Sequence, residues 1–504
     1  MQANVLQWLD QTACLMPDKT ALCDEQGQIT YGDFRAKSLA IARTIISKRE
    51  DTDRKIPIVV YLEKSLKVIT SFMGIAYSGG FYSPIDVDMP ASRADKILEV
   101  LKPRFVITTR ELQESFSKLH FEGEYILYDE VQSAEHDEEI VAETVSKIID
   151  TDLLYVLFTS GSTGVPKGVS ITHRSVIDYI DWVTKTFNVQ PDDRFGNQAP
   201  FYFDNSILDI YSCIKTGATH FIIPKKLFFQ PVRLLEYIKE NNINTIFWVP
   251  SALIVVSKLR TFEEVDLTGV LKRVLFCGEV MPNKQLNEWR KYLPDVIYAN
   301  LYGPTEITDA CTYYIVSRKF DNDEPLPIGI PMDNTDIIVL NDKDELVTGD
   351  EVGELCVRGT SLAVGYYNNP EKTKEAFVQN PLNPAYPETI YRTGDLVKYN
   401  EYGELVYLSR KDFQIKHLGH RIELGEIEVA VSSLPEISLC CCLYDEKRQR
   451  IVLFIDAHLD KKEIRERISS LVPDYMLPGK VVTLEDMPIN ANGKIDRVKL
   501  KELL

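Results

Sequence analysis

Short apolar runs alternate with amphipathic stretches of helical length along most of this 504-residue sequence. Residues 57–61 and 105–108 have the apolar composition of buried strands, and residues 65–78 and 91–101 repeat apolar side chains at helical spacing. Strands that alternate with helices in this way are typical of α/β units with a largely parallel sheet. This alternation constrains the fold more than any other feature, and it predicts the α/β class.

The pattern changes in the second half of the chain. Residues 335–357 read as short alternating strands with turns, which indicates a β-rich subdomain, and residues 397–408 read as a hairpin. A small α+β unit is expected after Arg410. Because 504 residues are too many for one hydrophobic core, we expect a large N-terminal domain at 1–409, built of α/β subdomains plus the β-rich subdomain, and a small C-terminal domain at 410–504.

Charge and hydropathy restrict the class of function. The chain has 57 Lys and Arg against 75 Asp and Glu, a net charge of −18. That excess of acid argues against nucleic-acid binding, which needs cationic side chains at the phosphates. The sequence has no apolar run of about 18 residues and no cationic, then apolar, N-terminus. We therefore expect a cytoplasmic protein without membrane insertion.

Residues 158–168 read Phe-Thr-Ser-Gly-Ser-Thr-Gly-Val-Pro-Lys-Gly and follow an apolar strand. The glycines predict a loop whose N–H groups, together with its hydroxyls and Lys167, suit a polyphosphate. The loop is not a P-loop, because Pro166 stands before Lys167 where that motif needs glycine. A flexible surface loop is the other interpretation of a Gly/Ser/Thr stretch.

Seven stretches, taken in order, resemble the motifs of the adenylate-forming superfamily, specifically an amino-acid adenylation domain of the nonribosomal-peptide type. The resemblance covers essentially the whole chain and implies a mobile C-terminal domain. The seven stretches lie at residues 77–86, 158–168, 302–306, 353–367, 391–395, 409–428 and 492–497.

The resemblance implies a binding site for ATP with Mg²⁺. Tyr302 would stack on the adenine, Asp395 would accept the ribose hydroxyls with help from Arg410, and Glu306 would ligate Mg²⁺ as a hard oxygen donor. The implied ATP-binding residues are Thr159, Ser160, Gly161, Ser162, Thr163, Gly164, Lys167, Asn300, Tyr302, Thr305, Asp395, Arg410 and Lys494.

Lys494 is the implied catalytic residue. It would bridge the substrate carboxylate and the α-phosphate, where negative charge gathers in the transition state; a solvated lysine near the C-terminus is the alternative. The implied reaction forms an acyl-adenylate and then passes the acyl group to a thiol, with the C-terminal domain turning on a hinge at Asp412. Ser409 departs from the glycine usual in the family.

The substrate stretch, residues 197–211, resembles that of the stand-alone D-alanine–carrier protein ligases. Asp204 would pair with the substrate α-ammonium, although an Asp in a turn is an alternative. Cys277 would narrow the pocket for a small D-amino acid, although plain core packing is an alternative. The implied substrate-binding residues are Asp204, Asn205, Leu208, Phe247, Leu275, Cys277, Leu301, Asp309 and Ala310.

Asp309 departs from the D-alanine ligases, which are apolar at this position. A second ionised carboxylate in an apolar pocket is costly without a partner. Either Asp309 turns away, or the substrate brings a hydroxyl or a second amine to it. Serine-like and diamino acids, such as ornithine or lysine, therefore stand beside D-alanine as expected substrates.

The chain ends seven residues after Arg497, with no carrier domain before or after the adenylation motifs. We therefore expect the thiol in trans, as phosphopantetheine on a separate carrier protein, with coenzyme A as an alternative. Two rival functions stay open: an acyl-CoA synthetase of the same superfamily and a nucleotide-binding regulator that kept the fold.

Overall fold

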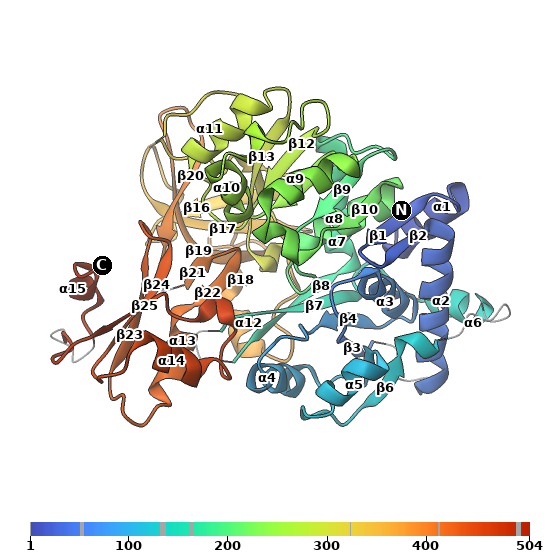
Figure 1. Ribbon diagram of the computed structural model, residues 1–504, viewed down its shortest axis with the longest axis horizontal. Helices are drawn as coiled ribbons and strands as arrows, with labels where there is room; N and C mark the ends of the chain where they lie inside the picture. Colours follow the sequence, from blue (N-terminus) through green and yellow to red (C-terminus); the bar gives the residue numbers. More distant parts are fainter. Residues whose placement is uncertain are drawn as a thin grey trace.

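The computed structural model describes residues 2–50, 55–131, 138–161, 165–322, 324–411, 414–489 and 495–504. The strands form two large, mainly parallel sheets, an antiparallel sheet and two small sheets (Figure 1). The predicted α/β class is confirmed.

The larger sheet has nine strands, most of them parallel. Helix α8 (Asn205–Thr216) packs on it, and α7 (His173–Thr186) packs on α8. From one edge to the other, the strands are β15 (Ile330–Pro331), β14 (Thr312–Ile315), β13 (Ile297–Tyr302), β12 (Arg273–Phe276), β11 (Thr245–Trp248), β9 (Arg194–Asn197), β10 (Thr219–Ile222), β1 (Thr20–Asp24) and β2 (Gly27–Thr30).

The second sheet has six strands, of which only β8 is antiparallel. Strand β3 near its centre, Pro57–Val60, is a completely buried apolar run, as the sequence pattern predicts for a covered parallel sheet. The strands in order are β6 (Glu124–Leu127), β5 (Phe105–Thr108), β3 (Pro57–Val60), β4 (Phe81–Pro84), β7 (Leu153–Thr159) and β8 (Lys167–Thr172).

Helices cover these two sheets and connect their strands. Caps stabilise several of them: the Thr30 hydroxyl accepts from the Asp33 N–H at the start of α2, and the Thr172 hydroxyl from the Ser175 N–H at the start of α7. The other helices here are α1 (Leu6–Leu15), α2 (Tyr31–Lys48), α3 (Leu66–Tyr77), α4 (Ala91–Leu101), α5 (Arg110–Phe116), α6 (Glu138–Val145), α9 (Pro231–Glu240), α10 (Pro250–Lys258) and α11 (Asn283–Tyr292).

An antiparallel sheet follows, in the region expected to be β-rich. The hairpin expected at 397–408 is present, with β19 and β20 paired from Asp395–Arg410 to Tyr399–Leu405. Arg410, the expected first residue of the C-terminal domain, is the last residue of β20, and the division of the chain there stays a prediction. The elements are β16 (Thr335–Leu340), β17 (Gly353–Gly359), α12 (Pro370–Ala376), β18 (Phe377–Gln379), β19 (Thr389–Tyr399) and β20 (Leu405–Arg410).

The C-terminal elements gather on one side of the molecule, at the left of Figure 1 in orange and red. A two-stranded hairpin comes first, and a three-stranded sheet with helices α13 and α14 follows. Their bounds are β21 (Gln414–His417), β22 (His420–Glu423), α13 (Leu424–Ser432), β23 (Cys440–Asp445), β24 (Arg450–Ile455), α14 (Lys461–Ile468), β25 (Lys480–Thr483) and α15 (Arg497–Lys501).

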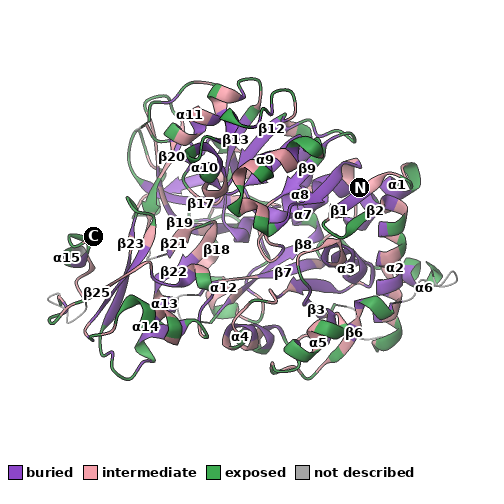
Figure 2. Ribbon diagram, viewed as in Figure 1, coloured by how far each residue is buried: buried purple, intermediate pink, exposed green. Residues whose placement is uncertain are grey.

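Buried residues concentrate in the sheets and in the inner faces of the helices (Figure 2). The largest apolar cluster spans the six-stranded sheet and the part of the nine-stranded sheet next to α8, and it includes Tyr82, Phe201 and Phe247. Within the described ranges, no helix is both long and apolar enough to cross a membrane.

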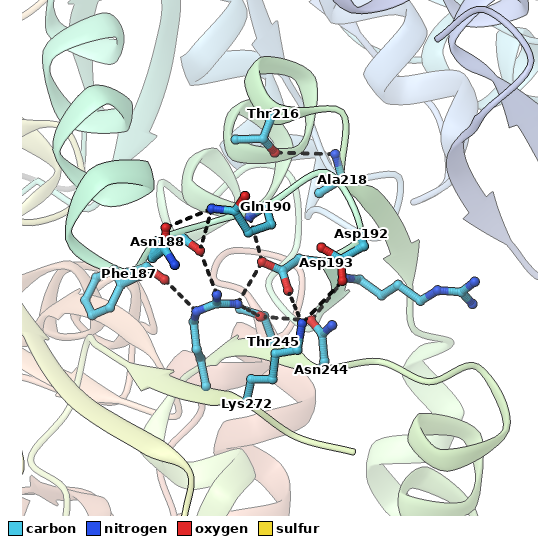
Figure 3. Close-up of polar contacts among 12 residues, drawn as sticks. Phe187, Asn188, Gln190, Asp192, Asp193, Thr216, Ala218, Asn244, Thr245 and Lys272 are labelled. Atoms are coloured by element: carbon cyan, nitrogen blue, oxygen red, sulfur yellow. Dashed lines mark hydrogen bonds and ion pairs between the residues drawn. The ribbon is translucent and has the colours of Figure 1, made fainter. Parts of the chain in front are cut away.

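A buried ion cluster joins the starts of strands β9, β11 and β12 (Figure 3). Asp193 is fully buried and accepts hydrogen bonds from Lys272 at 3.0 Å and from Arg273 at 2.9 Å. Arg273 also donates to the Phe187 carbonyl and to the Thr245 hydroxyl. Because both cations and the carboxylate are paired, the cluster fixes the relative positions of these strands.

Candidate functional site

The expected site residues meet where the two large sheets and the C-terminal hairpin come together. Three of them lie after the ends of parallel strands of the nine-stranded sheet: Cys277 directly follows β12, Glu306 lies beyond β13, and Asp204 lies beyond β9 at the start of α8. The carboxyl ends of parallel strands open on one edge of a sheet, and ligand sites of α/β proteins form there.

The expected phosphate loop is the tip of the β7–β8 hairpin. A loop was expected over all of 158–168, but Phe158 pairs with Gly168 and Thr159 with Lys167 as antiparallel strands, so the loop proper is shorter. A Cβ on Gly161 would lie 2.0 Å from the Val165 carbonyl oxygen, so this close approach needs glycine.

The residues expected to hold the ribose contact one another, and their role stays a prediction. The Tyr302 hydroxyl donates to one oxygen of Asp395, and Arg410 donates to the other at 2.7 Å. Pairing of β19 with β20 places Arg410 directly opposite Asp395. Asn300 instead donates its amide to the Pro327 carbonyl at 2.8 Å.

Glu306, the expected magnesium ligand, is completely buried and ionised. Burial alone would raise its pKa, but Arg421, Lys167 and the Tyr366 hydroxyl outweigh it and lower the pKa to about 2. The Arg421 guanidinium lies 2.5 Å from one carboxylate oxygen, and Tyr366 donates to the other at 2.7 Å. The site therefore already accommodates a positive charge against Glu306, which fits a cation ligand.

A cavity of about 50 Å³ lies beside these residues. Four expected substrate residues line it: Asp204, Asn205, Cys277 and Asp309. Loss of hydration raises the pKa of Asp204, against hydrogen bonding from Thr305 and the charge of Lys416. The other five expected residues do not line the open cavity but are buried in the apolar cluster behind it: Leu208, Phe247, Leu275, Leu301 and Ala310.

Asp309 does not turn away from the cavity. It is buried with a left-handed backbone, at φ 76°, and Tyr179 on α7 donates a hydrogen bond to its Oδ2 at 2.6 Å. Burial and the nearby Asp204 carboxyl hold its pKa well above the usual range for Asp. A buried hydroxyl on α7 is thus a partner for Asp309 that the sequence did not reveal.

The β21–β22 hairpin enters the site, which sequence reasoning missed. Its turn, Leu418-Gly419, has φ 52° and 79°, and the Gly419 N–H donates to Glu279 at 2.9 Å. Lys416 and Arg421 of this hairpin line the cavity, with the Lys416 ammonium 5.3 Å from the Tyr302 ring centre. Both residues lie within the stretch 409–428 that carries the family resemblance, so that signal was available for the hairpin.

Five expected site residues lie outside the described residues. They are Ser162, Thr163, Gly164, the hinge residue Asp412 and the catalytic candidate Lys494.

Comparisons with known proteins show what the chain is similar to. D-alanine--D-alanyl carrier protein ligase of Bacillus licheniformis is 33% identical over 99% of both chains. Tyrocidine synthase 1 of Brevibacillus parabrevis is 30% identical over 99% of this chain, which spans only 45% of that protein. The solved structure of holo-PA1221, an NRPS protein containing adenylation and PCP domains, superposes with a TM-score of 0.85 over 100% of this chain and 84% of that one, at 23% identity, and shows the shared fold.

Two family models also match this chain. The model described as AMP-binding enzyme matches residues 9–367, and the model described as AMP-binding enzyme C-terminal domain matches residues 426–494. The chain therefore belongs to the family of AMP-binding enzymes.

Proposed function

We propose that this protein uses ATP to activate a small amino acid and transfers it to the phosphopantetheine thiol of a carrier protein acting in trans. One observation carries the proposal: the Asp204 carboxylate lines a small cavity that also reaches Thr305, next to the ionised Glu306. The Asp204 carboxylate can pair with the ammonium group of an amino acid bound there. A simple carboxylic acid has no ammonium group to pair with this carboxylate. The similarity to a D-alanyl carrier protein ligase over 99% of both chains supports the same activity.

In the first half-reaction, the substrate carboxylate attacks the α-phosphorus of ATP, an aminoacyl-adenylate forms, and pyrophosphate leaves. Asp395 and Arg410 hold the ribose, Ser160 and Lys167 contact the phosphates, and Lys494 neutralises the charge that gathers at the α-phosphorus. Glu306 holds Mg²⁺, which supplies positive charge to the phosphates. In the second half-reaction, the thiol attacks the adenylate carbonyl and AMP leaves.

The C-terminal unit, residues 410–504, moves between the half-reactions on a hinge at Asp412, as in the family that the chain resembles. Coenzyme A is an alternative thiol. The expected cytoplasmic location stays a prediction.

Two features bear on the amino acid. The small cavity and Cys277 favour a small side chain such as that of D-alanine. Asp309, which lines the same cavity, favours a substrate with a hydroxyl or second amine, so a serine-like or diamino acid is a second candidate.

An ATP–pyrophosphate exchange screen with D- and L-amino acids in parallel, and with simple carboxylic acids, tests the proposal. We expect exchange with small amino acids. Asp204→Asn, which keeps the side-chain size and removes the charge, should lose this exchange and still bind ATP. Exchange with propionate or benzoate and no amino acid would favour an acyl-CoA synthetase. ATP binding without any exchange would favour a nucleotide-binding regulator.

A further inference from the structure

A buried polar cluster lies between helix α8 and strand β9, next to the segment that carries Asp204. Asn197, the last residue of β9, donates its side-chain amide to Oδ2 of Asp209 on α8 at 3.1 Å. Both residues are completely buried. The bond joins residues 12 positions apart and therefore closes the segment 198–208 into a loop.

Lys64 fixes the same segment from a second direction. It lies between strand β3 and helix α3, and its ammonium donates to the Gln198 carbonyl at 3.0 Å. The ammonium also lies 5.4 Å from the centre of the Phe201 ring, within the range of a cation–π contact. Lys64 thus contacts the start and the middle of the segment 198–204, whose last three residues line the substrate cavity.

The charges of this cluster cost stability instead of adding to it. Loss of hydration raises the pKa of Asp209 to about 8, against the Asn197 hydrogen bond and the charge of Lys64. It lowers the pKa of Lys64 to about 7, against the charge of Asp209. Among the described residues, Oδ1 of Asp209 and Oδ1 of Asn197 also have no hydrogen-bond partner. Uncharged side chains of similar size would be neutral or stabilising here, and groups retained at such a cost are expected where they serve function.

We propose that Lys64, Asn197 and Asp209 are positioning residues for the amino-acid substrate. None of the three lines the cavity; they hold the segment 198–204 so that Asp204 meets the substrate ammonium. A displacement of about 1 Å at a binding group is enough to weaken its interaction strongly, even when the cause lies far from the ligand. The inference rests on the proposed function, because it assigns the cluster to the substrate site of that reaction.

ATP–pyrophosphate exchange tests the positioning role, with whichever of D- or L-alanine and D- or L-serine the unaltered chain uses best. Lys64→Met removes the hydrogen bond to Gln198, so the KM for the amino acid should rise about tenfold, the effect of one lost hydrogen bond to a charged group. The KM for ATP should stay within about twofold. Lys64→Arg keeps the charge and a donor and should keep the KM for the amino acid closer to that of the unaltered chain. Lys226→Met, a change to a lysine that is 67% exposed, is the matched control and should have no effect.

A double variant separates positioning from stability. Lys64→Met combined with Asp209→Asn removes both buried charges and keeps an oxygen for Asn197, so the melting temperature should stay the same or rise. The KM for the amino acid should rise at least as much as in Lys64→Met alone. A merely structural cluster would instead give a lower melting temperature and a loss that falls equally on the amino acid and on ATP. Either that result or an unchanged KM for the amino acid in Lys64→Met would overturn the inference.

Hydrogen–deuterium exchange gives a second readout that does not depend on the proposed reaction. In Lys64→Met, deuterium uptake should increase at residues 198–204 and stay the same at strand β24, and no increase would contradict the inference. If no amino acid supports ATP–pyrophosphate exchange but the segment takes up more deuterium in Lys64→Met, the proposed function fails and the cluster still holds the segment. If amino acids support exchange but their KM is unchanged in Lys64→Met, the inference alone is wrong.

Discussion

At the scale of single residues, Asp309 bears most directly on substrate choice. Its Oδ2 is bonded to Tyr179, and its raised pKa follows from burial and from the neighbouring Asp204. Among the described residues, Tyr179 is its one hydrogen-bond donor. A substrate hydroxyl or amine that reaches this carboxyl would donate a further hydrogen bond to it. Each hydrogen bond that a buried carboxyl accepts stabilises it.

Asp309→Ala should therefore change which amino acids support ATP–pyrophosphate exchange. The KM for ATP should stay within about twofold of its value in the unaltered chain, a change well below the effect of one lost hydrogen bond. The preference should move toward apolar side chains, since the cavity then lacks its second acid. Tyr179→Phe is the matched control, because it keeps the carboxyl and removes only its donor. An unchanged profile in Asp309→Ala would remove this residue from substrate selection.

At the scale of elements, the ion cluster around Asp193 holds strands β9, β11 and β12 in register (Figure 3). Burial would raise the pKa of Asp193, but the Gln190 N–H, Lys272 and Arg273 outweigh it and lower the pKa. A carboxyl with a lowered folded pKa stabilises the fold above its unfolded pKa of about 3.9, and this stabilisation is lost as the pH falls toward the folded pKa.

Asp193→Asn should lower the free energy of unfolding at pH 7 by about 3–5 kcal/mol, the usual cost of breaking a buried ion pair. The difference from the unaltered chain should shrink as the pH falls below about 4, where the carboxyl of the unfolded chain takes up a proton before the carboxyl of the folded chain does. Thermal or denaturant unfolding at the two pH values measures it. The neighbouring Asp192, whose side chain is 77% exposed, provides the control Asp192→Asn, which should change stability little. A pH-independent difference would contradict the role assigned to the charge of Asp193.

At the scale of the whole molecule, a buried ion pair is among the contacts that join the C-terminal unit to the rest. Arg93 on α4 is bonded to Glu426 on α13, and both side chains are almost fully buried. Arg93 and Glu426 lie 333 positions apart in the chain, and Glu426 belongs to the C-terminal unit while Arg93 does not. The pair therefore exists only when that unit is docked as in this structure.

Arg93→Ala should slow aminoacyl transfer to the carrier protein at least tenfold, because loss of one partner leaves a buried charge unpaired in the docked arrangement. ATP–pyrophosphate exchange belongs to the other half-reaction and should be largely kept. Glu426→Ala should behave alike, and the double variant should be no worse than the worse single variant. Equal loss of both half-reactions in Arg93→Ala would show that the pair supports the fold and not the docked arrangement.

The amino-acid sequence by itself determined the order of strands and helices, the α/β class and the family resemblance, which the two family models confirm. These features depend on local periodicity and on short motifs, which are properties of neighbouring residues. The ends of elements were less accurate, as in the expected loop at 158–168, where the cross-strand pairs of Thr159 and Lys167 extend the strands.

Only the tertiary structure decided which distant side chains share a site. Tyr179 meets Asp309 across 130 positions, and Arg421 meets Glu306 across 115. No periodicity or motif spacing encodes such a contact, because it depends on how a helix packs on a sheet and on how one unit docks against another. The physical reason is that a buried charged group is stable only when it is paired. The fold, rather than the local sequence, determines which partners are within reach.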